Sequence, residues 1–396
     1  MEHDYNFWII SGEASGDMYG ARLAKDLKHM VEEKGKTVRI AGMGGPRMQE
    51  TDMDILVDST ELGVVGMVEI FKHIFTFIGI FFGLLRRIGK ERPDAVVLID
   101  YPGFNLMFAR CMYYWYKIPV IWYVSPQVWA WGKHRIPKLG KLCDRMMVIF
   151  PFETEVYAHT GLDVRFVGHP LIDIINERLD QELKRDPATF LLLPGSRTHE
   201  VEMLLHSMLD TVCELHRKHP ELNFVLSAPR EKIYNLVNKL VAEYRAAHPE
   251  LPEIKISCGD TPYWQQRAGT GLAASGTVTV ECAISGLPLV VCYRLKDFTF
   301  WVARKIIKLF RGYFTMVNII AYKTVYEEFL QWQVCPAELV PAIEKILPGG
   351  SRREEVEADM HMVKDMLCCG SDNASVNAAR VCLELADAKH AQQKNS

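Results

Sequence analysis

The chain has 396 residues, of which 49% are hydrophobic and 24% charged, and its formal net charge at pH 7 is −3. This length predicts two domains rather than one core, and the near-neutral charge excludes nucleic-acid binding driven by the charge of the whole molecule. The ten cysteines form no CxxC pair, which favours free thiols in a reducing cytosol over a disulfide framework. The N-terminus has no basic stretch followed by a long apolar run, so no export signal is expected.

The first half of the chain alternates apolar runs with helical patterns. Strands are expected at 6–11, 37–45, 94–100, 119–125, 145–151 and 163–171. After the first run, Leu23, Leu27 and Val31 recur at four-residue steps, which indicates an amphipathic helix. Strands that are apolar on both faces are typical of a parallel sheet covered by helices. The alternation predicts a doubly wound α/β domain over residues 1–175.

Two segments combine apolar side chains with cations, at 64–85 and at 298–314. The charge-free part of the first covers only 74–85, whereas a membrane span needs roughly 20 residues. A buried helix explains either segment alone. Apolar residues beside cations also suit a helix that lies in a membrane interface with its charges at the headgroups. Because one such segment occurs in each half, a peripheral membrane surface is favoured over core alone.

The same alternation restarts after a polar, linker-like stretch at 177–189. Strands are expected at 190–196, 223–229, 253–259, 271–275 and 288–294, and helices at 199–218 and 276–286. This pattern predicts a second Rossmann-like domain over 188–345. Beyond residue 350 the sequence is helical and polar, and helices within 350–390 are expected to pack on the N-terminal domain or on a partner subunit. The fold class is therefore α/β, with two doubly wound domains.

Ligands of open parallel sheets bind outside the carboxyl ends of the strands, so the loops that follow the strands are the candidate sites. The first of these loops, SGEASGD at 11–17, is rich in small residues that let a ligand approach the backbone. It lacks the GxGxxG spacing of a dinucleotide site, and Glu13 and Asp17 would repel a pyrophosphate. Ser11, Glu13, Ser15 and Asp17 are candidate substrate ligands. A plain strand-to-helix turn with Asp17 as the helix N-cap is the alternative.

Asp100 comes at the end of the apolar run 94–100. A carboxylate at the end of a buried strand is costly unless it is paired or used, and this one is well placed to act as a general base on an alcohol. The alternative is a carboxylate that holds the turn from Tyr101 to Asn105 through backbone amides. Asn105 is a candidate substrate ligand in the same turn. The loop at 125–135 adds tryptophans and cations, which suit either an anionic group or an ordinary packed surface.

In the second half, the strand that ends at Leu193 is followed by PGSR, residues 194–197, and then by a helix. Unpaired amides at a helix N-terminus favour an anion, and Arg197 can add a bidentate contact to a phosphate. A helix start with a surface arginine is the plain alternative. A second helix start rich in small residues lies at 275–277. Glu281 follows it by one turn on the same face and can accept hydrogen bonds from ribose hydroxyls. Together the two loops predict a site for a nucleoside diphosphate.

Nine motifs, taken in chain order, resemble those of the lipid-A-disaccharide synthase family, which is glycosyltransferase family 19. They are SGEASGDMYGARL, GMGGPRM, DYPGFN, SPQVWAW, FPFE, VGHPL, LLPGSR, AASGTVTVE and GLPLVVCYR, and they extend over nearly the whole chain. The resemblance implies a GT-B architecture, in which two Rossmann-like domains face a cleft, and an inverting, metal-independent transfer without a cofactor. It implies UDP-2,3-diacylglucosamine as the donor and 2,3-diacylglucosamine 1-phosphate (lipid X) as the acceptor. The implied products are a β(1→6)-linked disaccharide 1-phosphate and UDP.

The resemblance also assigns roles to individual positions. It makes Asp100 the general base for the 6-hydroxyl of the acceptor. The implied UDP-binding residues are Gly195, Ser196, Arg197, Ser275, Gly276, Thr277, Glu281 and, by a looser match, Asn318 and Gln331. Val317 stands where the family often has proline, so the backbone near Asn318 departs from the pattern. The resemblance further implies work at the cytoplasmic face of the inner membrane, through 64–85 and 298–314, and allows a homodimer through the C-terminal helices.

Two other functions share parts of this pattern. A UDP-sugar epimerase of GT-B fold would use the nucleotide loops of the second half but would not need the apolar segments. A non-catalytic lipid-binding protein would use the apolar segments but would need neither Asp100 nor two anion-binding loops. No spacing of His, Cys or Asp predicts a metal site, and no GxxxxGK[ST] loop is present. The sequence therefore favours the transferase.

Overall fold

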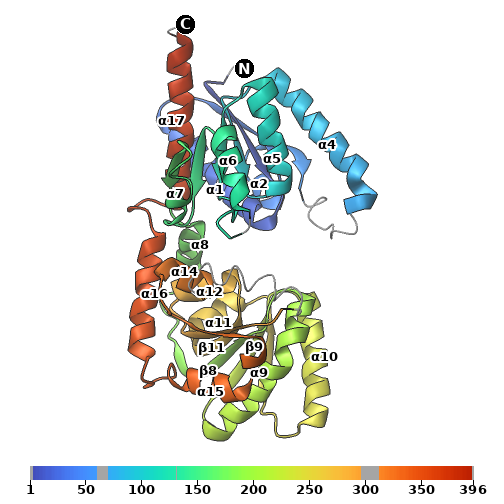
Figure 1. Ribbon diagram of the computed structural model, residues 1–396, viewed down its shortest axis with the longest axis vertical. Coiled ribbons are helices and arrows are strands. Elements are labelled where there is room, and N and C mark those ends of the chain that lie inside the picture. Colours follow the sequence, from blue (N-terminus) through green and yellow to red (C-terminus); the bar gives the residue numbers. More distant parts are fainter. Residues whose placement is uncertain (1–2, 60–69, 131, 296–311, 395–396) are drawn as a thin grey trace. The chain divides into compact units, whose positions relative to one another are not determined.

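The chain forms two compact units (Figure 1). The computed structural model describes residues 3–59, 70–130, 132–295 and 312–394. The first unit contains residues 1–170 and 367–396, and the second contains residues 171–366. Each unit is built around one parallel sheet that is covered by helices. The predicted α/β fold class with two doubly wound sheets is confirmed.

The first unit has a seven-stranded sheet in the order β3-β2-β1-β4-β5-β6-β7. Its strands are β1 (Tyr5–Ser11), β2 (Val38–Gly44), β3 (Asp54–Asp58), β4 (Ala95–Ile99), β5 (Val120–Tyr123), β6 (Arg145–Val148) and β7 (Asp163–Phe166). The sequence predicted all of them except β3. This strand lies at the sheet edge and is only partly buried, so its DILVD sequence lacks the continuous apolar run that marks the central strands.

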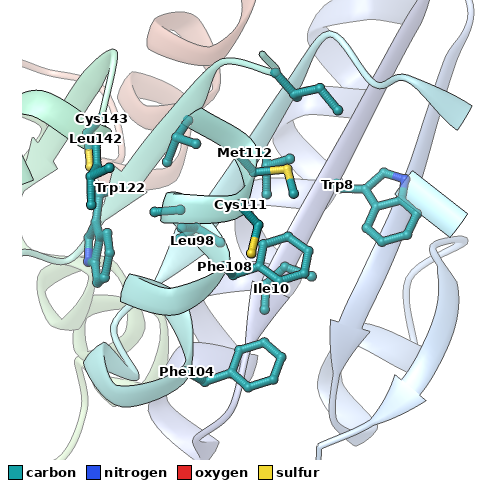
Figure 2. Close-up of a cluster of buried hydrophobic side chains, with 14 of the residues drawn as sticks. Trp8, Ile10, Leu98, Phe104, Phe108, Cys111, Met112, Trp122, Leu142 and Cys143 are labelled. Atoms are coloured by element: carbon teal, nitrogen blue, oxygen red, sulfur yellow. The ribbon is translucent and has the colours of Figure 1, made fainter. Parts of the chain in front are cut away.

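A buried apolar cluster covers one face of the first sheet (Figure 2). Trp8 of β1 and Trp122 of β5 belong to it, together with Phe108 of helix α5 (Pro102–Cys111). A buried indole N–H needs a partner, and that of Trp8 donates to the carboxylate of Glu91 at 3.0 Å. The cluster fixes α5 on the sheet, and with it the turn between β4 and α5.

The helices of the first unit include one from the far end of the chain. They are α1 (Ala14–Glu33), α2 (Pro46–Gln49), α4 (Ile70–Glu91), α5, α6 (Ile136–Leu142), α7 (Glu153–Val156) and α17 (Ala374–Lys394). Helix α17 packs against α1. The Tyr5 hydroxyl donates to Asp387 at 2.5 Å, and His390 pairs with Asp94 at 2.8 Å. The last helix therefore completes the first unit of its own chain.

The second unit has a six-stranded parallel sheet in the order β10-β9-β8-β11-β12-β13. Its strands are β8 (Asp186–Leu193), β9 (Asn223–Ala228), β10 (Ile254–Cys258), β11 (Ala268–Ala274), β12 (Leu289–Tyr293) and β13 (Glu327–Leu330). The edge strand β13 was not predicted. The expected linker at 177–189 is wrong at both ends, because helix α8 (Pro170–Arg178) extends into it and β8 begins inside it.

Seven helices described in the second unit, in addition to α8, pack on or beside this sheet. They are α9 (Thr198–Lys218), α10 (Glu231–Ala247), α11 (Thr261–Arg267), α12 (Thr277–Ile284), α14 (Met316–Ala321), α15 (Pro336–Glu344) and α16 (Arg353–Leu367). Helix α16 is held by an ion pair of 2.6 Å between Lys323 and Asp359 and by contact of Met360 with the Tyr326 hydroxyl. The two C-terminal helices thus belong to different units.

The apolar segment at 64–85 falls partly in helix α4, whereas 298–314 lies outside the described residues as far as 311. Phe81 of α4 packs edge-on against two phenylalanine rings of α5. Ile78 and Phe82 are exposed. This part of α4 therefore has one side in the core and apolar side chains in solvent. Within the described ranges, no helix is both long and apolar enough to cross a bilayer.

The packing of α17 predicts that two alanine-to-aspartate substitutions on this helix differ greatly in their effect on the free energy of unfolding. Ala386 is fully buried and Ala388 is exposed. Ala386→Asp should lower the free energy of unfolding by about 3 kcal/mol or more, because it buries a carboxylate without a partner. Ala388→Asp is the control and should change it by less than about 1 kcal/mol. Urea denaturation of both variants measures the difference, and equal stabilities would contradict the packing of α17.

Candidate active site

The first unit changes its direction of winding between β1 and β4, and loops at such a switch point form the usual ligand crevice. Ser11 pairs with Ile99 across these strands, so the loops that follow them meet. A Cβ at Gly12 would lie 2.4 Å from the Tyr101 ring, so only glycine permits this approach. Glu13 and Asp100 therefore lie close enough for their charges to interact.

The backbone at this edge of the sheet is strained. Asp100 and Tyr101 adopt the left-handed conformation in succession, with φ of 45° and 46°. Val124, directly after the neighbouring strand β5, has φ of 66°, which is unfavourable for a β-branched residue. Outliers of this kind gather at functional sites because the surrounding structure must hold them. Their position supports the switch point as the site.

The pKa of Asp100 is unusually high for a carboxyl group. Burial, and secondarily the charge of Glu13, raise its pKa to about 6, while a backbone hydrogen bond from Tyr101 lowers it in part. A carboxylate with this pKa is ionised at neutral pH and is still basic enough to take a proton from an alcohol. The turn itself is held chiefly by Asn105, whose side-chain amide donates to the carbonyl of Asp100 at 2.8 Å. Asp100 is therefore available for chemistry.

Asn105 leaves one polar atom unused. Its Nδ2 also donates to the carbonyl of Ile99 at 3.2 Å, whereas its buried Oδ1 has no hydrogen-bond partner among the described residues. A buried acceptor without a donor is costly, so such an atom is a candidate for a ligand hydroxyl. Ser11 is buried and its hydroxyl donates to the carbonyl of Glu13, while the side chains of Glu13 and Ser15 are exposed.

The structure gives Asp17 a different role from those predicted. Helix α1 begins at Ala14, so the expectation that Asp17 caps its own helix is wrong. Its buried carboxylate accepts hydrogen bonds from the backbone amides of Gly45, Arg47 and Met48 at 2.7, 2.9 and 3.1 Å. These amides belong to the start of α2, which needs an acceptor there. Asp17 therefore joins the start of α2 to α1, and its contact with a substrate stays a prediction.

In the second unit, the switch point lies between β8 and β11, and the two predicted nucleotide loops follow these strands. Gly195 has φ of 127° and allows the first loop to turn into α9. The carboxylate of Glu200 accepts long hydrogen bonds of 3.3 Å from the amides of Ser196 and Arg197. It also pairs with the Arg197 guanidinium at 2.9 Å. An anion already lies against the predicted diphosphate loop, and it comes from the protein itself.

Two further residues reach this loop and were not predicted. Arg230 follows β9 and donates from its guanidinium to the carbonyl of Ser196 at 3.0 Å. Tyr293 ends β12, and its pKa is raised by burial and then by the charge of Glu200. Both stand at the carboxyl ends of strands, so the rule that selected Arg197 could have found them. The loop therefore has two arginines beside it.

The second loop, at 275–277, is open. A Cβ at Gly276 would meet no atom within 4 Å, and Thr277 is exposed at the start of α12. Ser275 is fixed by its amide, which donates to the carbonyl of Cys292 at 3.1 Å. Glu281 accepts a hydrogen bond of 3.1 Å from buried Gln265, a partner that the sequence did not suggest. The carboxylate of Glu281 is thus oriented before any ligand arrives.

Asn318 and Gln331 bind backbone groups of the chain. Asn318 is fully buried, accepts from the amides of Val325 and Tyr326, and donates to the carbonyl of Tyr326 at 2.8 Å. Gln331 exchanges two hydrogen bonds with the backbone of Leu295 at 2.6 and 2.9 Å. Both amides therefore hold loops together, and their direct contact with UDP stays a prediction.

Among the described residues, neither a cluster of metal ligands nor a cavity suggests a different site. Within the part of the chain that the structure describes, no three His, Cys, Asp or Glu side chains cluster as metal ligands do. A cavity of about 830 Å³ is lined by residues such as Asp210, Tyr244 and Pro336, and it contains none of the predicted site residues. It lies by the last turns of α9, toward the amino ends of the strands, so the strand-end loops remain the candidate site.

The chain matches known proteins along its length. A family model described as Lipid-A-disaccharide synthetase matches residues 7–381. Proteins named lipid-A-disaccharide synthase from Geobacter sulfurreducens and Syntrophus aciditrophicus are 33% and 34% identical over 96% and 95% of this chain and 97% of each relative.

Solved structures are similar in fold. They include a Staphylococcus aureus MnaA–UDP co-structure, with a TM-score of 0.60 and 14% identity over 94% of both chains. A UDP-GlcNAc 2-epimerase from Neisseria meningitidis bound to UDP-GlcNAc has a TM-score of 0.59 and 12% identity over 96% of this chain and 99% of that one. At these identities the similarity establishes the GT-B fold alone.

The proximity of Glu13 and Asp100 predicts a coupled titration. Glu13→Gln removes a negative charge that disfavours ionised Asp100, so the pKa of Asp100 should fall below about 6. Carbon-13 NMR titration of labelled aspartate carboxyls measures this, with Asp100→Asn identifying the signal. Glu32→Gln, an exposed change in the last turn of helix α1, is the control and should leave the pKa of Asp100 unchanged. An unchanged pKa in Glu13→Gln would show that the two carboxylates do not interact.

Proposed function

The chain belongs to the lipid-A-disaccharide synthase family and is a glycosyltransferase of lipid A biosynthesis, and from this premise we propose its reaction in detail. It transfers 2,3-diacylglucosamine from the UDP derivative to the 6-hydroxyl of 2,3-diacylglucosamine 1-phosphate (lipid X), with inversion and without a metal. The products are a β(1→6)-linked disaccharide 1-phosphate and UDP. The observation that carries this proposal is the half-buried carboxylate of Asp100 at the first switch point, with a pKa of about 6.

Asp100 acts as the general base in this reaction. It takes the proton of the acceptor 6-hydroxyl while the oxygen attacks the anomeric carbon of the donor and the bond from that carbon to the diphosphate breaks. Inversion follows from attack opposite the leaving group. The free Oδ1 of Asn105 accepts a hydrogen bond from an acceptor hydroxyl. Ser11, Glu13 and Ser15 line the acceptor side of the same crevice.

UDP leaves as an anion, and the first loop of the second unit receives its diphosphate. Amides of Gly195 and Ser196 and the guanidiniums of Arg197 and Arg230 stabilise the charge that develops on the leaving oxygen. Since Glu200 engages some of these donors, the diphosphate shares or replaces its contacts. UDP and UDP-GlcNAc bound to proteins of the same fold support the binding of a UDP-sugar by this chain.

The second loop receives the nucleoside. Ser275, Gly276 and Thr277 offer an open backbone at the start of α12. Glu281, which Gln265 orients, accepts hydrogen bonds from the ribose hydroxyls. Asn318 and Gln331 contribute through the loops that they hold.

We further propose peripheral attachment to the cytoplasmic face of the inner membrane through 64–85 and 298–314, since the substrates carry acyl chains. The exposed Ile78 and Phe82 of α4 support the first of these contacts. A homodimer through the C-terminal helices is part of the same proposal. An epimerase would need none of these apolar surfaces, and the relatives at about a third identity are synthases.

Asp100→Asn tests the base. Transfer should fall by roughly 10²–10⁴-fold because the amide cannot take a proton, while UDP affinity measured by calorimetry stays the same. In the wild type, kcat/KM should fall as the pH drops through about 6, since protonated Asp100 cannot accept the proton. Product formation from UDP-diacylglucosamine and lipid X is the assay. Unchanged turnover in Asp100→Asn would remove this residue from the mechanism.

Arg197→Ala tests the diphosphate loop, and α9 supplies a matched control. Arg197 and Arg217 have side chains 68% and 69% exposed, and each pairs with a glutamate three residues away on the same helix. Arg197→Ala should weaken UDP binding by about tenfold through loss of a charged hydrogen bond, whereas Arg217→Ala should leave it unchanged. Calorimetry with UDP measures both. Equal affinity in the two variants would place the diphosphate elsewhere.

A further inference from the structure

A compact group of exposed aromatic rings and lysines lies on the first unit, after helix α5. We call it the aromatic-basic patch, and its members are Tyr113, Tyr114, Trp115, Lys117 and Lys141. The Trp115 side chain is 69% exposed, and the two tyrosines are also exposed. Helices α5 and α6 run from the carboxyl ends of β4 and β5 back toward the amino end of the next strand, and the patch stands at their far ends. It is therefore separate from the strand-end loops of the candidate active site.

The local backbone presents the rings to solvent. Residues 112–116 form a single π-helical turn, which closes with a hydrogen bond of 2.7 Å from the amide of Lys117 to the carbonyl of Met112. Met112 is buried in the core. The ring of Tyr116 packs so tightly on Gly89 that a Cβ there would lie 2.6 Å away. Because both ends of the turn face inward, the three rings between them project outward. Turns of this kind are rare and often mark functional positions.

The lysines of the patch are placed among the rings. Lys117 Nζ lies 5.3 Å from the centroid of the Tyr113 ring. Lys141 Nζ, from α6, lies 5.7 Å from the ring of Tyr113 and 5.5 Å from that of Tyr114. These distances are those of cation–π contacts. A hydrogen bond with Tyr114 raises the pKa of Lys141, so its charge is retained. Apolar ring surface and positive charge thus occur side by side.

The sequence around the patch is free of negative charge. No aspartate or glutamate occurs between residues 101 and 143. The lysines and arginines in this stretch are Arg110, Lys117, Lys133, Arg135, Lys138 and Lys141. Because the whole chain carries a net charge of −3, this stretch is a local exception. The surface that it supplies is complementary to an anionic partner.

We propose that the aromatic-basic patch docks on a lipid bilayer that contains anionic phospholipids. Tryptophan and tyrosine have an apolar body with a polar tip, which suits the boundary between acyl chains and headgroups. Lysines beside them meet lipid phosphates while their stems stay with the apolar layer. The choice of a bilayer over a protein partner rests on the proposed function, because its substrates carry acyl chains. The patch is distinct from the segments 64–85 and 298–314.

Vesicle binding by the full chain tests the patch, and Trp332 provides the control. Trp332 is 79% exposed but lies in the second unit, outside the patch. With vesicles of phosphatidylethanolamine and phosphatidylglycerol (3:1), Trp115→Ala should reduce the partition coefficient by about tenfold, and Trp332→Ala should leave it unchanged. Brominated lipids should quench the fluorescence of Trp332→Phe more than that of Trp115→Phe, in which Trp301 is the tryptophan that remains in a proposed membrane contact. Equal loss or equal quenching in the two variants would overturn the proposal.

The positive charge of the aromatic-basic patch is also tested by vesicle binding. Lys141→Glu should weaken binding to the anionic vesicles about tenfold or more but should not affect binding to vesicles of phosphatidylcholine alone. Lys239→Glu, which changes an exposed lysine on helix α10 of the second unit, is the matched control and should change neither. Equal effects of the two substitutions would show that only the net charge of the protein matters, which would contradict docking through the patch.

Two further measurements separate this proposal from its premise and from its main rival. Transfer with detergent-dispersed substrates should be unchanged in Trp115→Ala, since the patch is apart from the active site. Transfer absent from the wild type would refute the proposed function, whereas transfer present without vesicle binding would refute only the docking surface. Sedimentation equilibrium should give the same mass for wild type and Trp115→Ala. A dimer that Trp115→Ala dissociates would assign the patch to a second copy of the chain instead.

Discussion

The pairing of β1 with β4 at the switch point of the first sheet is the constraint on which the proposed chemistry depends. Parallel strands end at one edge, so their loops must share the crevice between them. Gly12 lets the Tyr101 ring lie against the first loop, and this contact leaves Asp100 half-buried near Glu13. Burial and a neighbouring charge then make an ordinary carboxyl group into one suited to accept a proton. The raised pKa of Asp100 is therefore a consequence of strand order.

Helix N-termini near the two sites are supplied with carboxylates from the protein itself. Asp17 binds the amides at the start of α2, and Glu200 binds those at the start of α9. The physical need is the same, because the first amides of a helix have no partner within it. The consequences differ. Asp17 is buried and holds the start of α2, whereas Glu200 engages the exposed Arg197 at the loop proposed for the diphosphate. A ligand there meets donors that are already oriented.

The first unit combines this crevice with a surface of a different kind. At the strand ends, polar groups are held by backbone geometry, as in Asn105. At the far ends of α5 and α6, aromatic rings and lysines are exposed and held mainly by one another. The seven-stranded sheet and its apolar cluster lie between the two and keep them apart. Catalysis and attachment can therefore be altered independently.

The sequence by itself determined the fold class, the central strands and the loops that follow them, because parallel sheets leave long apolar runs and small-residue turns that are local in the chain. It also picked out Asp100, which stands directly after such a run, and Arg197, which ends the loop that follows another. Only the tertiary structure decided which groups these residues meet. Arg230 and Gln265 reach the nucleotide loops from other strands and helices. The side chain of Asn318 forms its hydrogen bonds with backbone groups 7 and 8 residues away. Such contacts depend on how separate elements pack, and spacing along the chain does not encode that directly.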